Sequence, residues 1–194
     1  MKIVAITQRI DYHQSRNEYR DALDHRLNNF LLESGYLPFP IPNSLGFIVD
    51  EFLCELKPHA FLLSGGNDIG EFKIRDETER TILKYASINH IPVLGICRGM
   101  QMMANFAGVG LREVSNHICS THKLSGLITG TITCYHKYSI DSCPNDFSTL
   151  AISDDGEIEA IKHNILRWES WMWHPERDQF INPSYIQRMK ALFL

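Results

Sequence analysis

The sequence predicts an α/β fold in one domain over residues 1–194: an open, mostly parallel sheet flanked by helices, with extra antiparallel strands in the C-terminal half. Three observations support this fold class. Strand-like and helix-like segments alternate through the first half, which is typical of βαβ units. After about residue 110, short strand-like segments are separated by turn residues. No internal repeat, low-complexity tract or linker divides the chain.

The first half supplies the parallel strands and the helices between them. Lys2–Thr7 indicates a short apolar strand, and Tyr19–Ser34 indicates an amphipathic helix that Gly35 closes. Leu37–Pro42 is extended, and Phe47–Leu56 is the next helix candidate. Two further strand and helix pairs follow: Ala60–Leu63 with Glu77–Asn89, and Pro92–Ile96 with Met100–Phe106.

The second half predicts strands, a hairpin and a terminal helix. Asp154-Asp155-Gly156 favours a hairpin turn between two of the strands. Asn182-Pro183-Ser184 is typical of a helix start, and that helix is expected to end near Leu194. The predicted strands are Ile128–Tyr135, Tyr138–Ile140, Thr149–Ser153, Glu157–Ile161 and Ile165–Met172.

Composition and charge restrict the function classes. A chain of 194 residues with 44% hydrophobic residues can bury a core without a structural metal or disulfides. The net charge of −4 argues against binding to nucleic acid or to an anionic membrane. The start of the chain has no signal-peptide pattern, and no apolar run reaches the ~18 residues of a membrane helix. Five cysteines, an odd number, fit a reducing compartment, so we expect a cytoplasmic protein.

The segment Gly95-Ile96-Cys97-Arg98-Gly99 carries the strongest functional signal. A predicted strand ends at Ile96 and a predicted helix follows, which is the pattern of a nucleophile elbow with cysteine at its centre. Glycines on both sides relieve the crowding of such a turn. The N-terminus of the helix would favour the thiolate, and the Arg98 N–H would face an oxyanion. A structural cysteine in a tight turn is the alternative that the flanking elements disfavour.

His174-Pro175-Glu176 is the best candidate for the general base and its orienting acid. The segment follows an apolar strand, and an acid two residues after a histidine can fix the tautomer of its ring. Taken alone, the segment would indicate a surface turn. Ser64-Gly65-Gly66 follows a buried strand and could offer N–H groups to an oxyanion, although a simple turn would have the same sequence.

These three segments, in this order, resemble the class I glutamine amidotransferase superfamily. The similarity extends from Lys2 to about Glu176 and includes the run Gly95–Gln101. Within the superfamily, Ser153–Ala160 resembles the stretch that precedes the catalytic histidine in stand-alone γ-glutamyl hydrolases. The short chain is most similar to bacterial γ-glutamyl-CDP-amidate hydrolases in two segments, Leu23-Asp24-x-Arg26 and Trp171–Arg177.

The resemblance implies a flavodoxin-like fold and a covalent mechanism without a cofactor. Cys97 would attack the γ-carbonyl of a glutamyl amide, and His174, oriented by Glu176, would move the protons. Water would then release glutamate from the thioester. The resemblance also implies an oxyanion hole from the N–H groups of Gly66 and Arg98, with the glutamyl portion held by Gly65 and Gln101.

The side of the site that would hold the leaving amine differs from the usual pattern. Those hydrolases often carry Asn-Ser-x-His-His-Gln where this chain has Cys134-Tyr135-His136-Lys137-Tyr138-Ser139. Our hypothesis is that a diphosphate meets His136, Lys137 and Arg177, and that Trp173 or Trp171 stacks a base. Solvated charges and packed tryptophans are the simpler alternatives.

Metal binding and other functions complete the expectations. His117-x-Cys119-x-x-His122 has no evident fourth ligand and fits no zinc pattern, so we predict no metal and no cofactor. The expected partner is a small-molecule γ-glutamyl substrate, nucleotide-linked in the narrower hypothesis, with a homodimer left open. Two other functions stay open: a glutaminase subunit that delivers ammonia to a separate synthase, and a non-catalytic binding domain.

Overall fold

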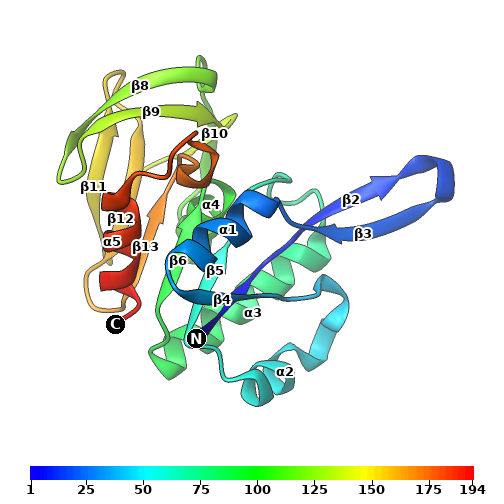
Figure 1. Ribbon diagram of the computed structural model, residues 1–194. Helices are drawn as coiled ribbons and strands as arrows, with labels where there is room; N and C mark the ends of the chain where they lie inside the picture. Colours follow the sequence, from blue (N-terminus) through cyan, green and yellow to red (C-terminus); the bar gives the residue numbers. More distant parts are fainter.

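A mixed sheet of nine strands forms the centre of the molecule (Figure 1). The structure is a computed structural model that describes residues 1–194. The strand order is β4-β1-β5-β6-β13-β12-β11-β8-β9. The first five strands in this order pair in parallel, and the pairs from β13 to β9 are antiparallel, which confirms the predicted fold class. The strands are β1 (Lys2–Ile6), β4 (Tyr36–Pro40), β5 (Ala60–Leu63), β6 (Val93–Ile96), β8 (Ile118–Gly126), β9 (Gly130–Tyr135), β11 (Phe147–Ser153), β12 (Ile158–His163) and β13 (Trp168–Trp171).

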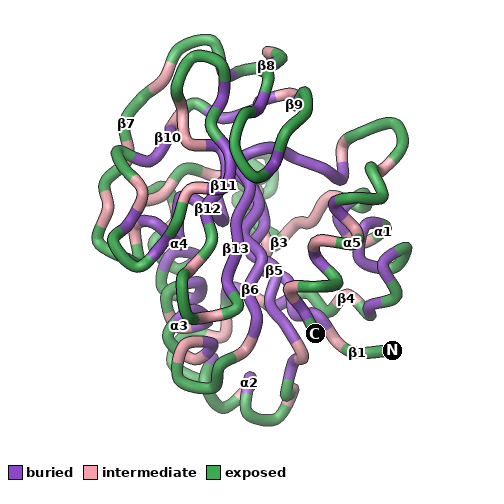
Figure 2. The backbone as a smooth tube through the Cα atoms, turned by 90° about the vertical axis from the view of Figure 1, so that its left-hand side faces the viewer, coloured by how far each residue is buried: buried purple, intermediate pink, exposed green.

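Helices cover both faces of the parallel half of the sheet (Figure 2). Successive side chains of a strand point to opposite faces, so Val4 and Ile6 join one apolar cluster and Ala5 joins the other. α1 and α5 pack into the first cluster, and α2, α3 and α4 pack into the second. The helices are α1 (His25–Glu33), α2 (Val49–Leu56), α3 (Lys73–Asn89), α4 (Arg98–Phe106) and α5 (Pro183–Leu192).

The predicted helix over Tyr19–Ser34 is wrong in its first part. β2 (Arg9–His13) and β3 (Glu18–Ala22) instead form a hairpin, joined through the 3-10 turn η1 (Gln14–Arg16), that projects from the body (Figure 1). Tyr19 fits the helical spacing by chance: it pairs with Tyr12 across the hairpin, with ring centroids 4.8 Å apart. The helix begins only after Asp24, whose side chain caps it by accepting a hydrogen bond from the Arg26 N–H.

Two strands of the second half were not predicted from the sequence. β8 is polar, with only His122 and Leu124 of its nine residues buried, so it lacks the apolar alternation that indicates a strand. β7 (Leu111–Glu113), which pairs with β10 (Tyr138–Ile140), was missed for the same reason. Two 3-10 segments, η2 (Asn43–Ile48) and η3 (Pro175–Arg177), complete the elements. No helix is both long enough and apolar enough to cross a membrane.

Candidate active site

Cys97 lies between β6 and α4 in a backbone conformation that only the surrounding structure can maintain. Its φ is 53° and its ψ is −107°, outside the regions that residues other than glycine favour. The Cys97 N–H donates to the carbonyl of Trp171 at 2.7 Å, which ties the turn to β13. A Cβ at Gly95 would lie 2.8 Å from the backbone of Gly99, and a Cβ at Gly99 would overlap the carbonyl oxygen of Leu63. The two glycines of the sequence motif are therefore required by packing.

His174 follows β13 and is oriented by Glu176, which lies in η3. Nδ1 of His174 is 2.6 Å from Oε1 of Glu176, and both residues are only 5% exposed. Because a carboxylate can only accept a hydrogen bond, Nδ1 of His174 carries the proton. Nε2, on the opposite side of the ring, remains available for another partner. A Cβ at Gly65 would lie 3.3 Å from that Nε2 and 3.5 Å from the Cβ of Cys97. The structure thus brings Cys97, His174 and Glu176 together around Gly65.

The environment of His174 favours the imidazolium form. Burial alone would lower the pKa of His174, but its hydrogen bond and charge interaction with Cys97, together with those to Glu176, raise the pKa to about 9. A cationic imidazole beside a cysteine is the arrangement that activates a sulfur nucleophile.

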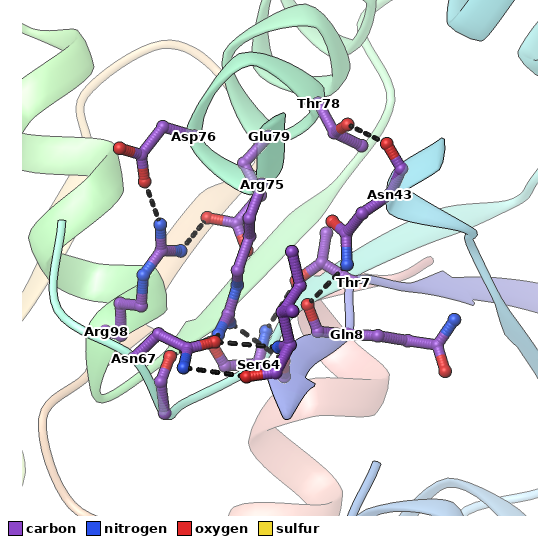
Figure 3. Close-up of polar contacts among 12 residues, drawn as sticks. Thr7, Gln8, Asn43, Ser64, Asn67, Arg75, Asp76, Thr78, Glu79 and Arg98 are labelled. Carbon is purple, nitrogen blue, oxygen red and sulfur yellow. Dashed lines mark hydrogen bonds and ion pairs between the residues drawn. The ribbon is translucent and has the colours of Figure 1, made fainter. Parts of the chain in front are cut away.

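Arg75 holds the loop Ser64–Asn67 from its buried side (Figure 3). Its guanidinium is fully buried and donates to the carbonyls of Ser64 at 2.9 Å, of Gly65 at 3.1 Å, and of Gly66. In a trans peptide the C=O and the N–H point in opposite directions, so the N–H groups of Gly66 and Asn67 face away from Arg75. Gly66 has a φ of +81°, which a side chain would disfavour.

A buried network of ion pairs joins this loop to the elbow. Arg98 pairs through its side chain with Asp76 and Glu79, and Arg75 pairs with the same Glu79 at 3.2 Å (Figure 3). Burial would raise the pKa of Glu79, but the charges of Arg98 and Arg75 hold it below its usual value. The guanidinium of Arg98 is therefore engaged by two carboxylates, and its backbone N–H, in the first turn of α4, has no partner within the helix.

This network was not predicted from the sequence. Its signal was present as Arg75-Asp76-x-x-Glu79, an Arg and a Glu four residues apart on one helix. Such pairs usually lie on solvated helix faces, so the spacing alone did not indicate a buried role.

Pockets open on both sides of His174. The first is lined by Arg9 and Leu23 of the N-terminal segment, by Gly65 and Gly66, and by His174 itself. A second lies between His174, Tyr135 and Trp173, and Arg177 lines both of them. Arg177 also lies over the Tyr135 ring, 4.7 Å from its centroid. A third pocket, lined by Arg26, Glu176 and Arg177, adjoins them. Three arginines therefore line the pockets at His174 and Glu176, and Arg9 and Arg26 were not among the predicted site residues.

The other predicted site residues each contact a partner outside the group formed by Cys97, His174 and Glu176. Gln101 is buried and donates to the carbonyl of Tyr138 at 2.8 Å. Trp173 stacks on Trp171 with ring centroids 5.8 Å apart, and it also lines a pocket with His174. Lys137 pairs with Glu113 at 3.0 Å on the surface, and it does not line the three pockets around His174. His136 does not line them either; it is buried and faces His117.

Comparisons with known proteins give the family and the fold. The family described as glutamine amidotransferase class-I matches residues 11–188. The chain is 31% identical to the γ-glutamyl-CDP-amidate hydrolase of Campylobacter jejuni, over 98% of this chain and 96% of that protein. It is 28% identical to a glutamine-hydrolyzing GMP synthase subunit of Methanosphaera stadtmanae, over 79% of this chain and 82% of that protein. A glutamine amidotransferase structure from Thermotoga maritima shares the fold, with a TM-score of 0.70 at 16% identity, covering 98% of this chain and 84% of that one.

Proposed function

The chain belongs to the class-I glutamine amidotransferase family, and we propose that it is a free-standing hydrolase that cleaves a γ-glutamyl amide bond. Family membership and the full-length similarity to a hydrolase support an amidohydrolase. The observation that carries the proposal is the strained elbow at Cys97 beside a histidine that hydrogen-bonds to Glu176. A domain kept only for binding has no need for this combination of residues.

The proposed reaction has two steps. The Cys97 sulfur bonds to the γ-carbonyl carbon, and the C–N bond then breaks as His174 gives its Nε2 proton to the leaving nitrogen. A water molecule next attacks the thioester and gives its proton back to His174, and the C–S bond breaks to release glutamate. The N–H groups of Gly66 and Arg98 are the proposed donors to the oxyanion in both steps, and one such donor contributes about 10²–10³ in rate.

The arginines support a leaving group that carries phosphate. In γ-glutamyl-CDP-amidate the scissile nitrogen is bonded to a phosphorus atom, so cationic groups must lie directly beside the reacting carbon. Arg9 and Arg177 line the pocket that contains Gly66 and His174, and Arg26 lines the adjoining one. We place the diphosphate there, with Trp173 and Tyr135 at the edge of the second pocket as candidates to contact the nucleoside.

A glutaminase subunit is the second candidate, favoured by the similarity to the GMP synthase subunit of Methanosphaera stadtmanae. That function requires a separate synthase, and glutamine would then be the only good substrate. The free-standing hydrolase instead requires full activity of the isolated chain on a γ-glutamyl amide with a larger leaving group.

Glutamate release from glutamine, a γ-glutamyl peptide and γ-glutamyl-CDP-amidate tests these alternatives. We expect preference for the nucleotide substrate and its loss in Cys97→Ala. Arg177→Ala is expected to raise KM for that substrate by roughly 10-fold or more, since a hydrogen bond to a charged group contributes about 1.5–3 kcal/mol. Lys137→Ala, which removes a cation outside the pockets around His174, serves as the matched control. Release from glutamine alone, rising only with a synthase present, would support the glutaminase function instead.

A further inference from the structure

A second cluster of titratable side chains lies in the antiparallel half of the sheet. His117 precedes β8, Cys134 lies in β9, His136 directly follows β9, and Glu159 lies in β12. His117, Cys134 and Glu159 are fully buried, and His136 is 3% exposed. None of the four has a place in the proposed hydrolysis, and a carboxylate buried this deeply needs a compensating positive charge.

The hydrogen bonds of the two imidazoles fix their tautomers. Nε2 of His117 lies 2.8 Å from a carboxylate oxygen of Asp155, and Nδ1 of His136 lies 3.1 Å from the carbonyl oxygen of Tyr138. Both partners can only accept, so these two ring nitrogens carry the protons. The opposite nitrogens, Nδ1 of His117 and Nε2 of His136, then present lone pairs toward each other.

Glu159 adds a third acceptor to the same point. The two imidazole nitrogens are 3.1 Å apart, and Oε1 of Glu159 lies 3.3 Å from His117 Nδ1 and 3.4 Å from His136 Nε2. While both imidazoles are neutral, three acceptors converge there with no donor among them. Such an arrangement is stable only when a positive charge, either a proton or a metal ion, lies between the three atoms.

The separations match the face of a tetrahedral metal site. Bonds of about 2.0–2.1 Å to nitrogen and oxygen place neighbouring ligand atoms roughly 3.3–3.4 Å apart in a tetrahedron. The Cys134 sulfur, 4.0 Å from both oxygens of Glu159, is in position to be the fourth ligand. The bonds from the outer nitrogens to Asp155 and to a backbone carbonyl are those that orient metal-binding histidines.

We propose that one Zn²⁺ binds in this cluster, with the ligands His117, Cys134, His136 and Glu159. Two imidazoles, a carboxylate and a thiolate form a donor set that suits zinc, and four protein ligands in a closed site make the ion structural. Of the sequence segment His117-x-Cys119-x-x-His122, only His117 is a proposed ligand: Cys119 is exposed, and His122 stacks on His117 while bonding to Asp154. The ligands come from three separate segments of the chain and form no local motif, which is why the sequence alone led us to predict no metal.

The ion would fix the strands that lead to His174. It would join the start of β8, the end of β9 and the start of β12, and β12 pairs with β13, which ends just before His174. Tyr135, between two of the ligands, contacts the His174 ring edge-on with centroids 5.8 Å apart. Removal of the ion is therefore expected to lower Tm by roughly 10 °C, since a ligand at about 1,000 times its Kd stabilises by about 4 kcal/mol.

Metal content and cobalt spectroscopy of the full chain test the proposal. The background is Cys97→Ala, which removes adventitious binding at the candidate active site. We expect about one zinc per chain after growth with zinc and purification without chelators. Co²⁺ in its place should give the visible bands of a tetrahedral site and a near-ultraviolet sulfur-to-cobalt band, which Cys134→Ser abolishes and Cys119→Ser, at an exposed cysteine, retains.

Each outcome decides a part of the proposal. The site would be overturned if the folded chain took up neither zinc nor cobalt and its Tm did not change when a chelator was added. The positive charge between the three atoms would then be a proton. Tetrahedral cobalt bands without a sulfur band would overturn Cys134 as a ligand. These readouts need no γ-glutamyl substrate, so the zinc site and the proposed hydrolysis can fail independently.

Discussion

Replacing Arg75 tests whether the buried guanidinium orients the proposed oxyanion donor. Arg75→Met keeps most of the side-chain volume and removes every bond to the carbonyls of Ser64, Gly65 and Gly66. The Gly65–Gly66 peptide would then be free to rotate, and its N–H would no longer be held away from residue 75. Loss of one positioned donor costs about 10²–10³ in kcat. Because the donor acts on the transition state, KM is expected to change little.

The same substitution also removes one partner of a buried ion pair. Arg75 and Glu79 are both fully buried and 3.2 Å apart, and breaking such a pair costs about 3–5 kcal/mol. For a chain of this length that corresponds to a fall in Tm of roughly 6–20 °C. Kinetics must therefore be measured well below the Tm of the variant, with folding checked by circular dichroism at the assay temperature.

A matched control separates orientation from stability. Asp76→Asn breaks the ion pair between Asp76 and Arg98 in the same network but does not touch the loop Ser64–Asn67. It is expected to lower Tm while keeping kcat within about threefold of the wild type. Arg75→Lys, which keeps the charge but has fewer donors, should recover stability more than kcat. If Arg75→Met keeps kcat within threefold while folded, the guanidinium does not position the oxyanion donor.

Three other predictions follow from the contacts. Gly65→Ala places a Cβ 2.7 Å from Cε1 of His174, so steady-state kinetics should show a loss of kcat of about 10-fold or more at nearly unchanged Tm. Gly99→Ala overlaps the backbone at Leu63, so thermal melting should show a destabilisation of more than about 3 kcal/mol, and a wild-type Tm would contradict the packing of the elbow. The pKa of His174 rises from 6.5 to about 9 on folding, so its contribution to stability is fully present below pH 6.5 and is lost as pH rises through 9. The Tm difference between wild type and His174→Gln should therefore shrink between pH 6.5 and pH 9. A difference that stays constant over this range would refute the raised pKa of His174.

How far the sequence predicts this structure depends on whether the signal is local. The strands β1, β5 and β6 and the elbow at Cys97 were predictable because short apolar runs and flanking glycines encode them directly. The hairpin of β2 and β3 was not, because its apolar residue Tyr19 packs on a neighbouring strand at a spacing that also fits a helix. β8 was missed because a polar strand at this position is specified by its partners β9 and β11 and carries no pattern of its own.

The candidate site also combines parts that have a local sequence signal with parts that have none. The side chains proposed to react and the N–H groups proposed to bind the oxyanion lie in three short motifs, whereas the groups that position them are charged residues on α3, where the sequence indicates a solvated face. Glu79 bonds to Arg75, which holds the loop at Gly66, and to Arg98, whose own backbone N–H begins α4 at the elbow. One buried carboxylate thus links the two segments that carry the proposed oxyanion donors. Buried charges are tolerated where function needs them, and this network joins the two segments that are proposed to converge on one substrate oxygen.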